Sequence, residues 1–231
     1  MSEALANTAK LFAEPARAAM LLILMGGRAV PAGELAVVAH VSPQTASEHL
    51  ARLIEGGCVT AQRQGRHRYY ELANADVAHV VESLLVLSSA PCAAIVSNTL
   101  RPALGTLEHA RTCYGHLAGW LSVAIADALQ RKGYLAAMPE RAFLVTDDGK
   151  EWFEKLGIPV ARSSTVTGIK LARQCPDWTE RRPHLAGTLG VAMYKRLSEL
   201  GWIAPSRESR AVLVSLRGRE AFLKHLHIVV G

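Results

Sequence analysis

Residues 42–55 of this 231-residue chain read Ser-Pro-Gln-Thr-Ala-Ser-Glu-His-Leu-Ala-Arg-Leu-Ile-Glu, and two glycines follow directly. Ser42 is a favourable N-cap residue, and Pro43 suits the first helical position. Apolar residues then recur at helical spacing and mark one buried face, namely Leu50, Leu53 and Ile54. The stretch therefore predicts a helix that ends at the glycines and keeps its polar side toward solvent.

A shorter helical segment precedes this helix at the separation that a helix-turn-helix requires. Residues 34–39 follow Pro31-Ala-Gly33, and His40-Val41 supplies the turn. A turn of about three to four residues lets the two helices cross, so that the second fits the major groove of DNA. We expect Gln44 and His49 to reach base edges. The predicted DNA contacts of the second helix are Ser42, Gln44, Thr45, Ser47, His49 and Arg52.

Two strand-like runs come next, residues 59–63 and 66–72, on either side of Gln64-Gly65. This pattern predicts a β-hairpin with a basic tip. Arginines on such a tip suit phosphates or the minor groove, although they can also be simply solvated. The helix pair, the polar helix face and the basic hairpin in this order favour DNA binding. The predicted contacts of the hairpin are Arg63, Arg66, His67 and Arg68.

Two further helices are expected in this part of the chain. Residues 5–25 have a helical apolar pattern that Pro15 interrupts, and residues 76–87 have a second one. Ser88-Ser-Ala-Pro91 is the most plausible boundary. The sequence thus predicts a winged helix-turn-helix domain over residues 1–90, with DNA-binding and dimerisation roles, and a second domain over residues 91–231.

Several motifs of residues 5–90 resemble those of the arsenic-repressor (ArsR/SmtB) family of winged-helix regulators. They are Phe12-Ala-Glu-Pro-Ala-Arg17, Glu34-Leu35, residues 42–53, and Gly65-Arg66 with Tyr69-Tyr70. The resemblance implies a homodimer built from the first and last helices of the domain. It also implies a palindromic operator and repression that an effector relieves.

The usual metal sites of that family are not expected here. Metal-sensing members carry cysteines two apart on the helix that begins Glu34-Leu35, whereas this chain has Ala36 and Val38 there. The helix at 76–87 offers Asp76 and His79 without the second histidine and acidic partner of the family's interfacial zinc site. The resemblance therefore implies a regulator without implying what it senses.

Residues 91–231 contain an internal repeat. His-Leu-Ala-Gly-Trp-Leu-Ser-Val at 116–123 matches His-Leu-Ala-Gly-Thr-Leu-Gly-Val at 184–191 in six of eight positions, an offset of 68 residues. Such self-similarity indicates two copies of one supersecondary unit, about residues 105–160 and 173–231. Each copy is predicted to be a helix, a β-hairpin and a closing helix, in one pseudo-symmetric domain. The fold class is mainly α with short β-hairpins (α+β).

The repeats also supply possible effector ligands: Cys113, His116, Cys175, His184, Arg181 and Arg182. A Cys-x-x-His spacing on a helix puts both side chains on one face, which suits a soft metal or metalloid ion. The preferred interpretation is that His-Leu-Ala-Gly is a helix-start element or a packing element between the repeats, with each histidine hydrogen-bonded in the interface. Arg181 and Arg182, with Arg111 at the equivalent place in the first repeat, could hold an anion or add DNA contacts, but a solvated face is preferred. The tyrosines and tryptophans of this half are expected mainly in the core.

Composition limits the remaining possibilities. Half of the residues are hydrophobic and 20% are charged, and no apolar run is long enough to cross a membrane. No secretory leader is visible, so we expect a cytoplasmic protein. The cysteines are widely spaced, which favours thiols or ligands over a disulfide framework. The net charge is +6, but residues 1–90 carry seven Lys and Arg against eight Asp and Glu, so global charge supports DNA binding only weakly.

No phosphate-binding loop, dinucleotide-binding or serine-hydrolase motif occurs, and the carboxylate pair Asp147-Asp148 is expected in a turn. We therefore predict a non-enzymatic DNA-binding regulator, an autoregulating repressor that binds a palindromic operator as a homodimer. It requires no cofactor and is released by a small-molecule or metal effector of the second domain. The alternatives are a thiol-, metal- or metalloid-responsive regulator using Cys113 and Cys175, and a winged-helix adaptor that does not bind DNA.

Overall fold

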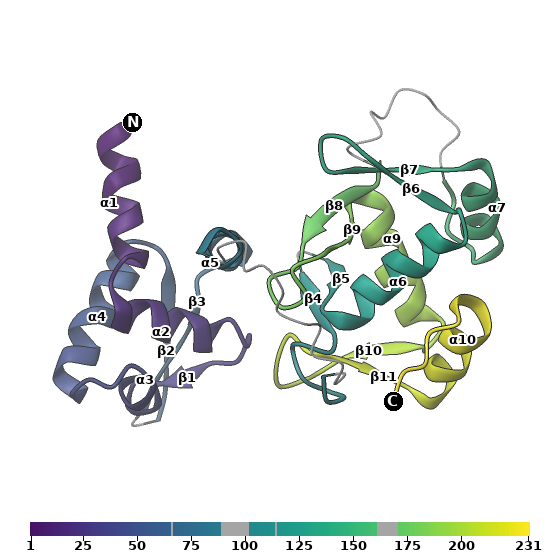
Figure 1. Cartoon of the computed structure of the whole chain (residues 1–231). Coiled ribbons are helices and arrows are strands. Elements are labelled where there is room, and N and C mark those ends of the chain that lie inside the picture. The colour runs from purple at the N-terminus through teal and green to yellow at the C-terminus, as the bar shows by residue number, and fades with distance from the viewer. Residues whose placement is uncertain (66, 89–101, 114, 161–170) are drawn as a thin grey trace. The chain divides into compact units, whose positions relative to one another are not determined.

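The computed structural model describes residues 1–65, 67–88, 102–113, 115–160 and 171–231. The chain divides into two compact units, Met1–Ser89 and Ala90–Gly231, each with its own hydrophobic core (Figure 1). Residues 90 and 91, at the predicted boundary, lie outside the described residues.

The first unit begins with two helices, α1 (Ser2–Phe12) and α2 (Pro15–Leu24). The break predicted at Pro15 is confirmed, because Pro15 opens α2 while Glu14 caps it by accepting a hydrogen bond from the Arg17 backbone N–H. The Arg17 guanidinium donates to the carbonyls of Lys10 and Leu11 at the end of α1. These carbonyls have no partner within the helix, so Arg17 joins α1 to α2.

The predicted helix pair is confirmed as α3 (Ala32–Val38) and α4 (Pro43–Glu55). Between them His40 adopts a left-handed backbone with φ of 53°. Ser42 caps α4, as predicted. Helix α5 (Ala75–Ser88) closes the unit. Leu35, Leu50 and Leu53 are each at most 1% exposed and pack with Met20 and Leu24 in the core.

The predicted hairpin is confirmed as β2 (Val59–Gln64) and β3 (His67–Leu72), which pair antiparallel from Val59↔Leu72 to Gln64↔His67. A short strand that the sequence analysis missed, β1 (Val30–Pro31), pairs with β3 on its other edge. Its two residues are too few to show an alternating pattern. The resulting three-stranded sheet has the order β1-β3-β2.

The second unit presents the same sequence of elements twice. The first series is β4 (Arg111–Cys113), β5 (His116–Ala118), α6 (Trp120–Arg131), β6 (Leu135–Met138), β7 (Ala142–Val145) and α7 (Asp147–Lys155). The second is β8 (Arg173–Pro176), β9 (Pro183–Ala186), α9 (Gly187–Glu199), β10 (Ile203–Pro205), β11 (Val212–Val214) and α10 (Leu216–Leu226). Each series is therefore hairpin, helix, hairpin, helix.

Among the described residues of the second unit, the strands form three sheets. Hairpin β8–β9 continues hairpin β6–β7 into a four-stranded sheet with the order β6-β7-β8-β9, through the pair Ala142↔Arg173. Hairpins β4–β5 and β10–β11 are two-stranded, and a bridge between Arg111 and Ala211 links them. The core lies around α6, where Leu121 and Leu129 are fully buried, and includes Phe153 and Phe222 from the closing helices.

The closing helices of the two series begin alike. Thr146 caps α7 and Ser215 caps α10, each by accepting from the N–H of a glycine three residues on. A Cβ on Gly149 would lie 2.1 Å from the Tyr134 carbonyl oxygen, and one on Gly218 would lie 2.0 Å from that of Trp202. Glycine lets each helix start touch the backbone that follows the preceding helix.

The repeated His-Leu-Ala-Gly does lead into a helix in each series, because Gly119 is the N-cap of α6 and Ala186 is the N-cap of α9. His116 and His184 themselves lie in strands β5 and β9 and hydrogen-bond to each other between the two series. The predicted turn at Asp147 is wrong. Asp147-Asp148 is not a turn but the first turn of α7, where acidic side chains complement the helix dipole.

Candidate functional site

The start of α4 is held by short polar side chains. The Ser42 hydroxyl accepts from the Thr45 backbone N–H at 3.1 Å and lies 2.8 Å from the Thr45 hydroxyl. The Ser47 hydroxyl donates to the Pro43 carbonyl at 2.9 Å. Each hydroxyl keeps a lone pair, so these bonds fix the side chains without removing their capacity to accept a further hydrogen bond.

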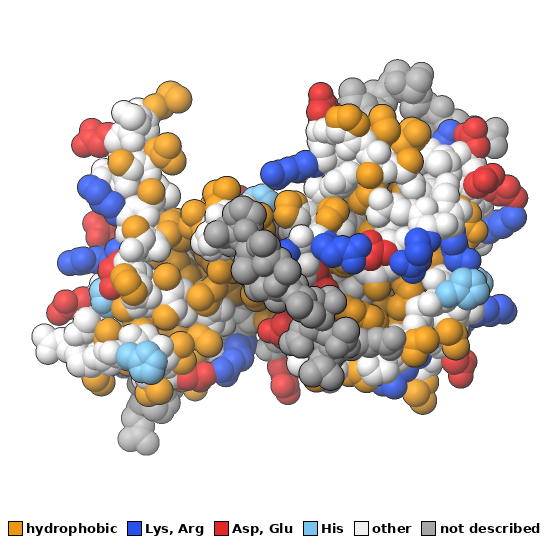
Figure 2. Space-filling model, viewed as in Figure 1, with side chains coloured by type: hydrophobic (Ala, Val, Ile, Leu, Met, Phe, Trp, Pro, Cys, Tyr) orange, Lys and Arg blue, Asp and Glu red, His pale blue; other side chains and the backbone are white. Residues whose placement is uncertain are grey.

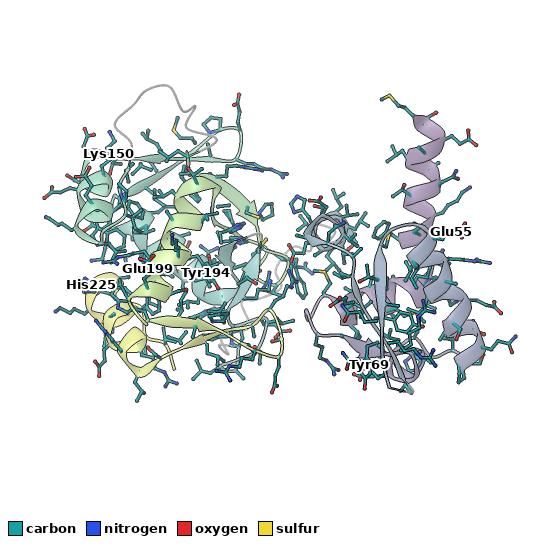
Figure 3. All side chains as sticks on the ribbon, turned by 180° about the vertical axis from the view of Figure 1, so that it is seen from behind. Glu55, Tyr69, Lys150, Tyr194, Glu199 and His225 are labelled. Atoms are coloured by element: carbon teal, nitrogen blue, oxygen red, sulfur yellow. The ribbon has the colours of Figure 1, made fainter. Side chains whose placement is uncertain are left out.

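An exposed polar stripe runs along α4 opposite its buried face. Residues at three- and four-residue spacing share one face of a helix. The stripe ends at Glu55, labelled in Figure 3, whereas Ala46, Leu50 and Leu53 face the core. Its exposed polar members are Gln44, Ser47, Glu48, Arg52 and Glu55, and the small, exposed Ala51 lies on the same face. Of the predicted contacts, Ser42, Gln44, Ser47 and Arg52 are exposed or partly exposed, and Thr45 is half-buried.

His49 is not on this stripe, which corrects its predicted place at base edges. Its side chain is only 15% exposed, with Nδ1 3.5 Å from Glu14 Oε2 and 3.4 Å from Arg17 Nη1. Its position, three residues after Ala46 and one before Leu50, turns it toward α2. His49 therefore ties α4 to the start of α2 rather than presenting its ring to a ligand.

The hairpin places two of its arginines side by side. Arg63 and Arg68 are directly opposed in the β2–β3 register, and both are exposed. The Arg68 guanidinium also lies 5.5 Å from the Tyr70 ring centroid. Like charges directly opposite each other destabilise a strand pair, so this pair favours an anionic partner. Arg66 lies outside the described residues, and His67 is placed in β3 opposite Gln64.

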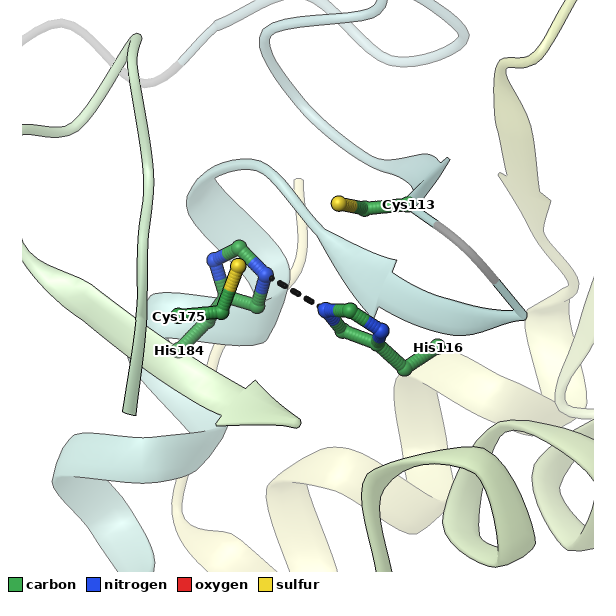
Figure 4. Close-up of side chains that lie close together, drawn as sticks. All are labelled: Cys113, His116, Cys175 and His184. Atoms are coloured by element: carbon green, nitrogen blue, oxygen red, sulfur yellow. Dashed lines mark hydrogen bonds between the residues drawn. The ribbon is translucent and has the colours of Figure 1, made fainter. Parts of the chain in front are cut away.

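A second constellation lies in the second unit, where Cys113, His116, Cys175 and His184 converge (Figure 4). One ligand atom from each residue lies within 4.8 Å of those of the other three. The two histidine Nε2 atoms are 3.0 Å apart. Cys113, His116 and His184 are buried, and Cys175 is half-buried. Two thiols and two imidazoles facing one another are a set of donors that can hold a metal ion.

Two hairpins, one from each series, bring these residues together. Cys113 is the cross-strand partner of His116 in β4–β5, and Cys175 is that of His184 in β8–β9. The prediction that Cys113 and His116 share a helical face is therefore wrong. A tight turn at Gly115, with φ of 85°, reverses the chain between them. Cross-strand neighbours approach closely, so a hairpin achieves what the helical spacing was expected to do.

A buried carboxylate, Asp177, lies beside the ring nitrogen of His184 that does not face His116. Asp177 Oδ2 lies 3.2 Å from His184 Nδ1 and accepts from the Gly119 N–H at 2.7 Å. Both Asp177 oxygens accept from Arg111 Nη2 at 3.0 Å, in an ion pair whose side chains are at most 1% exposed. Thr179 donates to Asp177 as well. Two charges buried together are stabilised only when hydrogen bonds of this kind accompany the ion pair.

The cluster strongly perturbs its own ionisation. Hydrogen bonding from Cys113 lowers the pKa of the Cys175 thiol far below its ordinary value against the opposing effect of burial, and His116 and His184 lower it further. Burial alone would lower the pKa of His184, but the neighbouring Asp177 carboxylate and the Cys175 sulfur raise it to about 9. Likewise, burial would raise the pKa of Asp177, whereas His184 and Arg111 hold it below its usual range. The two shifts run in the directions that favour negative charge on Cys175 and positive charge on His184.

Comparison with known proteins shows a relative along the whole chain. No protein-family model matches. An uncharacterized HTH-type transcriptional regulator of Bacillus subtilis, YdfF, is 41% identical over 230 residues, which is 100% of both chains. This chain belongs to the HTH-type transcriptional regulators. It has a helix-turn-helix DNA-binding domain. The HTH-type regulator YgaV of Escherichia coli is 30% identical over 83 residues, 36% of this chain and 84% of YgaV.

Solved structures that resemble this regulator match a smaller share of it. The homodimeric winged helix-turn-helix domain of Mb0332 from Mycobacterium bovis, a possible ArsR-family regulator, covers 37% of this chain and 79% of its own, with 29% identity and a TM-score of 0.34. The repressor BigR from Xylella fastidiosa covers 38% and 90%, with 27% identity and a TM-score of 0.35. At such scores the likeness does not define the architecture of the whole regulator.

The remaining predicted ligands of the regulator lie apart from the cluster centre. Arg181 and Arg182 are exposed, and Arg182 pairs with Asp127. Arg111, in contrast, is not solvated as the sequence analysis preferred but is 1% exposed. Sequence reasoning missed Asp177. The available indication was an acidic residue inside the Cys175–His184 hairpin, flanked by proline and tryptophan.

In the described ranges, no helix has the length and apolarity needed to span a membrane.

Proposed function

We propose that this regulator is a homodimeric repressor of the ArsR/SmtB type, which binds a palindromic operator through α4 and the β2–β3 hairpin. The exposed polar stripe of α4 is the observation that carries the proposal. A recognition helix must present hydrogen-bonding side chains outward while its other face is held by the core. Helix α4 meets both conditions, because Leu50 and Leu53 are at most 1% exposed whereas Gln44 and Arg52 face solvent.

The two elements have different tasks in this proposal. Gln44, near the N-terminus of α4, reads a base edge, where a glutamine pairs in bidentate fashion with adenine. Ser42, Thr45, Ser47 and Arg52 contact the flanking backbone or thymine methyl groups. Arg63 and Arg68, with Arg66 and His67, follow the phosphates or the minor groove. The opposed pair Arg63 and Arg68 is relieved of its mutual repulsion by the phosphates that it binds.

The dimer is proposed to form through α1 and α5. Helix α1 buries none of its residues, and Leu5 is 72% exposed. Hydrophobic side chains along α1 are visible at the upper left of Figure 2. Helix α5 exposes Val80, Leu84 and Leu87 by 41%, 42% and 78%. Two helices with exposed apolar residues in one small unit fit an interface with a second copy.

The second unit is proposed to be the effector domain, built from two pseudo-symmetric repeats. Its two series of elements, and the equivalent caps at Thr146 and Ser215, support the repeat. The cluster of Cys113, His116, Cys175 and His184 is the place in this unit where a thiol-reactive or metal effector would act.

Salt-dependent DNA binding tests the hairpin assignment. The probe is the duplex sequence that the wild-type chain selects from a random pool. Arg63→Ala with Arg68→Ala should weaken binding to all sequences and flatten the slope of log affinity against log salt by about one for each phosphate that is no longer neutralised. The matched control is Arg207→Ala with Arg217→Ala, two exposed arginines of the second unit. A hairpin variant with the slope of the control would refute the assignment.

The same titrations test α4. Gln44→Ala should cost about 1–3 kcal/mol for the selected operator relative to a scrambled duplex, because a base contact carries specificity. Its salt slope should be unchanged. Equal losses on both duplexes would show that Gln44 does not read sequence. A wild-type chain that selects no duplex from the random pool would favour a protein-binding adaptor.

A further inference from the structure

We infer that Cys113, His116, Cys175 and His184 form a tetrahedral site for one Zn²⁺ ion, which joins the first hairpins of the two repeats. These four side chains come from two segments that are distant in the sequence. Within the part of the chain that the structure describes, it is the one group of three or more metal-binding side chains that meet in this way. This inference does not depend on DNA binding.

The donors and their spacing fit zinc. Structural zinc sites are four-coordinate, with Zn–S distances of about 2.3 Å and Zn–N distances of about 2.0–2.1 Å. In a tetrahedron with these bond lengths, two nitrogens lie about 3.3 Å apart and two sulfurs about 3.8 Å apart. The histidine Nε2 atoms are 3.0 Å apart, and all four donor atoms lie within 4.8 Å of one another. Small rotations of the side chains thus suffice to reach the ion.

The second layer has the form expected around a zinc-bound histidine. Such a histidine usually donates its other ring N–H to a carboxylate, which fixes the tautomer and turns the free nitrogen to the metal. Asp177 stands 3.2 Å from His184 Nδ1, and His184 Nε2 points into the cluster. Asp177 is itself held by Arg111, Thr179 and the Gly119 N–H. The carboxylate is therefore placed before any ion binds.

The surroundings favour a closed site over a reactive one. His116, His184 and Cys113 are at most 5% exposed, so four protein ligands would exclude water from the ion. Half-buried Cys175 leaves a way in. A tetrahedral S₂N₂ set is typical of zinc, and two thiolates disfavour hard ions such as Mg²⁺ and Ca²⁺.

Metal binding has a mechanical consequence for the fold. Cys113 and His116 belong to β4–β5, whereas Cys175 and His184 belong to β8–β9, so the ion would cross-link the two halves of the second unit. A ligand that binds only the folded state raises the temperature of unfolding, as mass action requires. We expect zinc to raise the unfolding temperature of this unit.

The test uses the full-length chain, reduced, stripped with a chelator and reloaded with Zn²⁺ or Co²⁺ without DNA. We expect one tightly bound equivalent and, for Co²⁺, the intense visible bands of tetrahedral thiolate coordination. Cys113→Ser with Cys175→Ser should lose both. The control is Cys58→Ser, a buried cysteine of the first unit, which should keep both. A double variant that still binds one equivalent tetrahedrally would overturn the site.

A second measurement on the wild-type chain guards against a variant that fails to fold. Zn²⁺ should protect Cys113 and Cys175 from alkylation, mapped by mass spectrometry, and leave the labelling of Cys58 unchanged. Binding with octahedral Co²⁺ spectra, two-coordinate Cu⁺ as the only bound ion, or unprotected Cys113 and Cys175 would each refute the zinc site. Because no DNA is present, any of these results would leave the repressor proposal standing, and failed operator binding would leave the zinc site standing.

Discussion

At the scale of single residues, the most demanding position is Asp177. It is fully buried, and its oxygens accept from the Arg111 guanidinium, nearby backbone N–H groups and the Thr179 hydroxyl. Because Arg111 is buried as well, solvent cannot replace the Asp177 carboxylate as the partner of its charge. Such a pair adds little net stability when it forms, but removing either partner leaves the other charge buried alone and is strongly destabilising.

Asp177→Asn should accordingly destabilise the second unit by about 3–5 kcal/mol, because it leaves the Arg111 charge buried without its counter-ion. Denaturant unfolding followed by tryptophan fluorescence measures the change. The control is Asp127→Asn, which breaks the exposed pair with Arg182 and should cost at most about 1 kcal/mol. Equal effects of the two substitutions would contradict the role given to Asp177.

At the scale of elements, the start of each closing helix depends on a glycine. Gly149 and Gly218 stand where a methyl group would lie about 2 Å from a carbonyl oxygen of Tyr134 or Trp202. A backbone oxygen cannot move aside as the tip of a flexible side chain can, so the helix itself would have to shift.

Gly149→Ala and Gly218→Ala should each destabilise the second unit by about 1–3 kcal/mol, the usual cost of overpacking. The matched control is Gly33→Ala in α3, where a methyl group would meet nothing within 4 Å and should be neutral or slightly stabilising. Thermal unfolding of the three variants provides the comparison. A neutral result at Gly149 would mean that α7 can withdraw from Tyr134 at little cost.

At the scale of the whole molecule, the proposed assembly rests on α5 and its exposed leucines. Leu84→Glu with Leu87→Glu should convert the dimer to a monomer, because a carboxylate cannot be desolvated at an apolar interface without large cost. Sedimentation velocity reports the change. The control is Leu216→Glu, which alters an equally prominent leucine, 75% exposed, in the second unit. A wild-type chain that sediments as a monomer at working concentrations would disprove the assembly.

Local sequence was sufficient wherever the structure is itself local. The cap at Ser42, the leucine period of α4, the break at Pro15 and the hairpin around Gly65 depend on residues within a few positions of one another, and all are present as predicted. The repeated His-Leu-Ala-Gly also drew attention to the right histidines. The motif did not predict that these histidines lie in strands, because a Cys-x-x-His spacing suits both a helical face and a tight hairpin.

Chain folding alone decided which of these residues meet. His116 reaches His184 across 68 residues, and Arg111 reaches Asp177 across 66. Residue spacing within a single hairpin therefore could not predict either contact. The same holds for His49, which turns away from solvent because Glu14 and Arg17 of another helix lie beside it. Amino-acid order determined the helices, caps and hairpins through short-range sterics and hydrogen bonding. The four-ligand cluster exists only because core packing presses two distant hairpins together.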